Sequence, residues 1–196
     1  MTPFPIVERQ VHRIARPQKQ KKRETTMKHM MMPLVTAIFL LAGCVFESPL
    51  TTEHIISIDQ AVLGIWEPIP DDEKKAIQNE RMMILKYSDT EYLIHYPPGG
   101  NDELYYRGYP IKIGDVQCVQ LQIIGTADGP PANDVEDLFH IVSYQVTDDS
   151  LEIKTLNTEL VSDELKTIGE LRQAFLKHKN SKNLFIDPGV FRKVKK

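Results

Sequence analysis

Short apolar runs separated by turn residues constrain the fold of this chain more than any other sequence feature. Such runs recur between Arg81 and Leu156, and the turn signals Ser88-Asp89-Thr90, Gly114-Asp115 and Asp148-Asp149-Ser150 separate successive runs. Two strand-like runs joined by a turn of two or three residues are typical of an antiparallel hairpin. The spacing therefore predicts a mainly β, antiparallel domain.

The periodicity also predicts where the elements lie. Strands are expected over 63–66, 81–87, 91–96, 104–107, 111–113, 116–125, 138–147, 151–156 and 190–194, with a short closing segment at 184–186. A helix-like spacing covers 54–63 for about two turns. One longer helix is expected over 162–179, with Ser162 as its N-cap and basic residues in its last turn. Its apolar stripe consists of Leu165, Ile168, Leu171, Ala174 and Phe175.

A three-residue motif stands at the start of the first expected strand. Gly64-Ile65-Trp66 resembles the G-x-W motif that opens the first strand of lipocalins and related barrels. The resemblance implies that Trp66 packs at the closed end of a barrel, near an Arg from the end of the chain. Arg192 would supply that Arg and form a cation–π pair with Trp66. We therefore expect an antiparallel lipocalin-like barrel or a strongly curled sheet, with the C-terminal helix packed on it.

The N-terminal part of the chain has the charge pattern of a targeting signal. Residues 1–28 hold eight basic and two acidic residues, and the 15 residues from Met30 to Cys44 hold no charged side chain. A basic region followed by a short apolar region is typical of a secretory signal peptide. Residues from Met27 onward would form a compact signal peptide by themselves. A second hypothesis is therefore that translation starts at Met27.

The end of the apolar stretch is more specific. Leu41, Ala42, Gly43 and Cys44 resemble the lipobox of bacterial lipoproteins, and the whole chain resembles small uncharacterised lipoproteins. That resemblance implies cleavage before Cys44, a diacylglycerol on its thiol and an acyl chain, such as palmitate, on its new amino group. Val45, rather than Asp, follows the Cys and favours the outer membrane over the inner one. Two or three acyl chains would anchor the protein stably to a membrane.

These signals divide the chain into a signal peptide (1–43), a lipidated Cys with a tether (44–53) and one β-rich domain (54–196) outside the cytoplasm. From Cys44 onward the chain holds 16 basic and 25 acidic residues. A nucleic-acid-binding domain is expected to be basic, so a nucleic-acid partner is excluded. Lipidation of Cys44 would leave Cys118 alone, and its apolar surroundings predict a small buried hydrophobe.

Motifs for catalysis and for cofactors are missing from the sequence. It has no G-x-S-x-G elbow, no phosphate-binding glycine loop and no H-x-H, H-E-x-x-H or C-x-x-C spacing. His95 and His140 lie within expected strands, and we interpret them as hydrogen-bonded histidines rather than metal ligands. No cofactor and no metal site are therefore expected.

Tyrosine is concentrated in one part of the chain. Six of the seven tyrosines lie between residues 87 and 109. Tyrosine combines apolar area with a polar tip and is enriched at interfaces, but it is also an ordinary strand residue. The candidate binding surface consists of Tyr92, Tyr96, Tyr105, Tyr106 and Tyr109.

The sequence thus predicts the cellular location of the protein more specifically than its function. The leading hypothesis is a non-enzymatic, lipid-anchored cell-envelope protein that binds a small apolar ligand or an envelope protein partner. One alternative is a small periplasmic hydrolase whose site is assembled only in space. Another is a structural component of an envelope complex.

Overall fold

The computed structural model describes residues 45–70, 80–98, 103–132 and 138–195. The signal peptide and the lipobox residues Leu41, Ala42, Gly43 and Cys44 lie outside the described residues.

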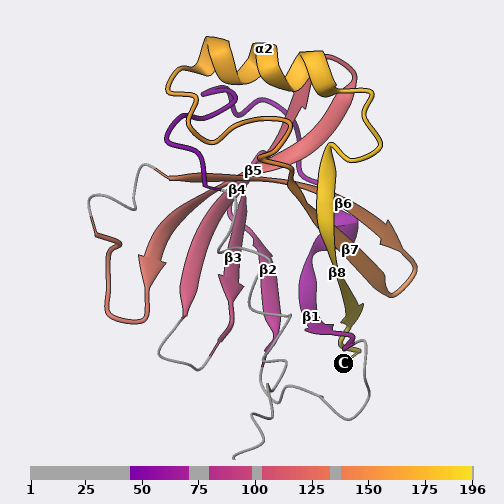
Figure 1. Ribbon diagram of the computed structural model, residues 1–196. Coiled ribbons are helices and arrows are strands. Elements are labelled where there is room, and N and C mark those ends of the chain that lie inside the picture. Colours follow the sequence, from indigo (N-terminus) through magenta and orange to yellow (C-terminus); the bar gives the residue numbers. More distant parts are fainter. Residues whose placement is uncertain (1–44, 71–79, 99–102, 133–137, 196) are drawn as a thin grey trace, which may run out of the picture. The chain divides into compact units, whose positions relative to one another are not determined.

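Eight antiparallel strands form one sheet that closes on itself (Figure 1). Each strand pairs with the next one along the chain, and β8 pairs with β1, so the ring has no free edge strand. Within the described residues, this arrangement confirms a mainly β domain with one α-helix. The strands are β1 (Gly64–Pro68), β2 (Met82–Lys86), β3 (Tyr92–Tyr96), β4 (Leu104–Ile113), β5 (Val116–Thr126), β6 (Phe139–Thr147), β7 (Ser150–Leu156) and β8 (Phe185–Lys193).

Two strands are longer than the sequence predicts. The expected strands 104–107 and 111–113 are one strand, β4, although Pro110 lies inside it. Strand β3 begins at Tyr92, opposite Gly108, so Pro110 has no described ladder neighbour on the β3 side of β4, where it lacks an N–H. Strand β8 likewise runs through Asp187-Pro188-Gly189, because an irregularity in its pairing with β7 absorbs the turn-like residues.

The helical segments are shorter than expected. Between 54 and 63 the structure has only the 3-10 turn η2 (Gln60–Val62). Helix α2 covers Ile168–His178 and begins after Thr167 rather than after Ser162. Thr167 Oγ1 accepts a hydrogen bond from the Glu170 backbone N–H at 3.2 Å and donates one to the Glu170 carboxylate at 2.7 Å. This capping pair fixes the start of the helix.

Two separate cores lie on the two faces of the sheet. The inner core fills the ring and includes Trp66, Tyr106 and Leu121. The outer core lies on the outside of β4, β5 and β6, where α2 supplies Leu171 and Phe175. Alternation along β4 and β5 sends successive side chains to opposite cores, so these strands are buried on both faces.

The outer core also includes the segment that was expected to be a tether. Phe46 and Leu50 are fully buried in it. Phe46 and Phe139 exchange two backbone hydrogen bonds of 2.8 Å, and the Leu50 backbone N–H donates to the Gln120 side chain at 2.7 Å. Phe46 and Leu50 are therefore packed against the sheet.

Candidate functional site

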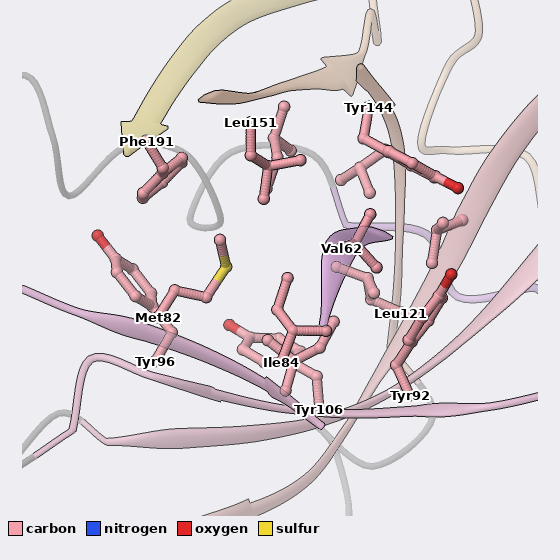
Figure 2. A pocket seen from close by; sticks show the side chains of 14 residues that line it. Val62, Met82, Ile84, Tyr92, Tyr96, Tyr106, Leu121, Tyr144, Leu151 and Phe191 are labelled. Atoms are coloured by element: carbon pink, nitrogen blue, oxygen red, sulfur yellow. The ribbon is translucent and has the colours of Figure 1, made fainter. Parts of the chain in front are cut away.

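The interior of the ring contains an apolar cavity of about 60 Å³ (Figure 2). Its lining comes from η2 and from seven of the eight strands, and consists of hydrophobic side chains and four tyrosines. The residues other than tyrosine are Val62, Met82, Ile84, Ile94, Val119, Leu121, Val142, Leu151, Ile153 and Phe191. The described lining thus contains no charged side chain.

Two tyrosine hydroxyls at one side of the cavity are held by Asp59 (Figure 2). The Asp59 backbone N–H donates to the Tyr92 hydroxyl at 2.7 Å, and the Tyr144 hydroxyl donates to Asp59 Oδ2 at 3.4 Å. The other carboxylate oxygen of Asp59 accepts from the Ala61 N–H and caps η2. These hydroxyls are therefore engaged by the segment that covers this side of the ring.

The other two tyrosines place their oxygens on the opposite side of the view in Figure 2. Tyr106 is 1% exposed, and its hydroxyl has no hydrogen-bond partner among the described residues. Burial raises the pKa of Tyr106, and burial followed by the charge of Glu80 raises the pKa of Tyr96 to about 12. Both phenols therefore stay protonated at neutral pH and are able to donate a hydrogen bond.

The remaining tyrosines of the candidate surface do not face the cavity. Tyr105 stacks on His95 with a ring separation of 4.3 Å, and its hydroxyl donates to Glu103 at 3.1 Å. Tyr109 is buried in the outer core, where it stacks on His54 at 3.5 Å and binds the Gln120 amide. The five tyrosines therefore lie on both faces of the sheet and do not form one surface.

Trp66 is fully buried in the inner core and donates its indole N–H to the Val62 carbonyl at 2.8 Å. The cation above its ring is Lys193, whose Nζ lies 4.9 Å from the ring centroid, and not Arg192. Arg192 is the neighbouring residue on β8, so alternation points it away from the interior. There it pairs with Glu67 at 2.6 Å. The expected cation–π contact thus exists with a different residue.

The two strand histidines lie on opposite faces of the sheet. His95 pairs across the ladder with Tyr105 and lies 3.2 Å from Glu103 on the outer face. His140 pairs with Leu121, faces inward, and contacts the Tyr106 ring edge-to-face. The described residues contain no group of three or more metal-ligating side chains.

Cys118 is buried in the outer core, as expected of a small hydrophobe. Burial raises the pKa of its thiol to about 12. A thiol with such a pKa holds very little thiolate at neutral pH, so Cys118 is a poor nucleophile.

A charged cluster that the sequence patterns do not predict lies on the outer face of the sheet. The buried Glu91 carboxylate accepts hydrogen bonds from Arg107 and contacts His54 Nδ1 at 2.6 Å. Burial acts to raise the pKa of Glu91, but the hydrogen bonds and charges of Arg107 and His54 together hold it below its usual value. No local pattern signals this cluster, because its three members come from distant parts of the chain. The cluster ties residues 46–55, the N-terminal segment of the described domain, to the start of β3 and to β4.

A second hollow, of about 690 Å³, lies beside η2. Its lining mixes charged, polar and apolar residues, including Asp59, Gln117, Ile111 and Asp148. Such a mixture indicates no single class of ligand. The lining of the interior cavity, in contrast, indicates an apolar ligand.

No family model, curated protein or solved structure matches the chain. Within the described residues, no helix combines the length and hydropathy that crossing a membrane requires.

Proposed function

We propose that this chain is a lipid-anchored cell-envelope protein that holds a small apolar molecule inside a lipocalin-like ring of strands. The observation that carries the proposal is the uncharged cavity within the closed sheet. Apolar cavities of proteins stay dry and take up apolar guests. At about 60 Å³ the cavity is far below the ~300–1,000 Å³ of typical drug-sized sites. The occupant is therefore a small ring or a short chain.

Toluene is a suitable probe of this cavity, and methyl NMR locates it. We expect toluene to shift the methyl resonances of the inner residues Ile84 and Leu121, while those of the outer residue Leu171 stay in place. Val142→Met should weaken binding, because the larger side chain fills the cavity. Val190→Met, on the outer face of β8, is the matched control. Unshifted inner methyls in a toluene-saturated sample of the wild type would refute ligand binding.

Native mass spectrometry of the protein purified from its own envelope in mild detergent tests for a natural occupant. We expect an extra mass, beyond the acyl chains, that disappears on denaturation. The anchoring part of the proposal rests on Leu41-Ala42-Gly43-Cys44 and has its own test. Mass spectra of the processed protein should show an acylated Cys44, and Cys44→Ala should release the protein from membranes. An unmodified Cys44 would refute the anchor alone.

Exposed apolar side chains on the outer faces of β1, β2 and β8 favour a second candidate function, which is binding to an envelope protein. Ile65, Leu85 and Val190 are each more than a third exposed. Exposed apolar side chains that gather into a patch mark sites of protein association. Cross-linking in intact cells would capture a partner at Leu85, and its loss in Leu85→Glu would support this candidate.

A further inference from the structure

One oxygen in the cavity has no protein partner within the described chain. Tyr106 is 1% exposed, and its hydroxyl makes no hydrogen bond to any described protein group. A buried hydroxyl without a partner destabilises a fold, and most buried polar atoms are therefore paired. Phenylalanine at this position would fill the same space without that cost. The hydroxyl thus points to a hydrogen bond that the described residues do not make.

Two of the other tyrosine hydroxyls of the cavity have hydrogen-bond partners. Tyr92 and Tyr144 are bound by Asp59, at the side of the cavity that η2 covers. Figure 2 shows the Tyr106 oxygen away from that pair, on the same side of the view as the Tyr96 oxygen. The cavity therefore has one side where the polar atoms are engaged and one where Tyr106 offers a donor and an acceptor.

The lining also restricts the charge of the occupant. None of the described residues that line the cavity carries a charged side chain. A carboxylate or an ammonium group transferred into such a space loses its hydration and gains no counter-charge, so its binding is strongly disfavoured. An uncharged oxygen needs only the one hydrogen bond that Tyr106 is able to supply.

We propose that Tyr106 is the specificity-determining residue of the cavity, and that its occupant is an uncharged small apolar molecule with one hydroxyl or carbonyl oxygen. That oxygen hydrogen-bonds with the Tyr106 hydroxyl, and the carbon part of the molecule lies among Ile84, Leu121 and Phe191. This inference rests on the proposed function and adds the chemical class and the orientation of the ligand.

Phenol and toluene test the inference, because they differ only by a hydroxyl in place of a methyl group. Dissociation constants of both are measured for the wild type and for Tyr106→Phe. We expect the phenol affinity, relative to that of toluene, to fall about tenfold in Tyr106→Phe, as the loss of a hydrogen bond between neutral groups predicts. Toluene itself should bind the variant at least as well as it binds the wild type. Benzoate at pH 8 should bind neither protein.

Tyr105→Phe is the matched control. It removes the hydroxyl of the neighbouring residue on β4, which lies on the outer face and binds Glu103. The ratio of the two affinities should not change in this variant. A ratio that is equally unchanged in Tyr106→Phe would overturn the inference and leave the proposed function intact. If the wild type binds neither toluene nor phenol, the proposed function is refuted instead. Unfolding curves establish that each variant is folded.

Discussion

At the scale of single residues, the neighbouring side chains Arg192 and Lys193 have different roles despite their equal charge. Lys193 Nζ lies over the buried Trp66 ring and donates to the Ala61 carbonyl at 2.9 Å, whereas Arg192 reaches an exposed ion pair with Glu67. We expect Lys193→Ala to lower the free energy of unfolding by about 1–2 kcal/mol. Arg192→Ala should lower it by less than about 1 kcal/mol. Urea unfolding of both variants measures the difference, and equal losses would contradict the assignment.

A second residue, Glu91, links stability to pH. Its pKa is lower in the folded protein than its usual value, so the unfolded chain binds the proton more tightly. The stabilisation by Glu91 is therefore complete at neutral pH and is lost as the pH falls through about 4 and below. We expect Glu91→Gln to be less stable than the wild type at pH 7, and the difference to shrink in acid. Unfolding curves between pH 7 and pH 3 test this, and parallel losses in the two proteins would contradict it.

At the scale of the elements, local patterns predict the hairpins well. The turns at 88–90 and 148–149 join strands whose pairing is set within a few residues of the turn. Prediction failed where a distant contact decides. Pro110 and Pro188 look like strand breaks, yet each lies inside a strand. At Pro110 the pairing of β4 with β3 has already stopped, and near Pro188 the pairing of β8 with β7 shifts its register. The cavity, the two cores and the Glu91 cluster depend on residues far apart in sequence, and no local signal announces them.

The start of α2 gives a test of the same point. Sequence favoured Ser162 as the N-cap, but the Ser162 hydroxyl accepts a turn hydrogen bond from the Glu164 N–H, and Thr167 caps the helix. We expect Thr167→Ala to lower the free energy of unfolding by about 0.5–2 kcal/mol, the usual cost of losing a cap. Ser162→Ala should cost less. Thermal unfolding of both variants decides, and a larger loss for Ser162→Ala would reverse the assignment.

At the scale of the whole molecule, the N-terminal segment and α2 together close the outer core over β4, β5 and β6. Arg172 on the helix donates to the Leu50 carbonyl at 3.2 Å, so the two covering segments also bind each other. We expect Phe46→Ala to lower the free energy of unfolding by about 3–5 kcal/mol, as for other buried aromatic residues. Ile55→Ala, at a 76% exposed position of the same segment, should change it by less than about 0.5 kcal/mol. Urea unfolding of both variants measures these values, and a small loss for Phe46→Ala would show that the segment is dispensable.

The burial of Phe46 also limits how far the protein is able to reach. Cys44, the residue proposed to carry the acyl chains, stands two positions before this fully buried side chain. Two extended residues span only about 7 Å. Acyl chains on Cys44 would therefore hold the domain close to the lipid headgroups. The molecule bound in the cavity would then be exchanged with the membrane leaflet that holds the domain, or with a protein embedded next to the domain.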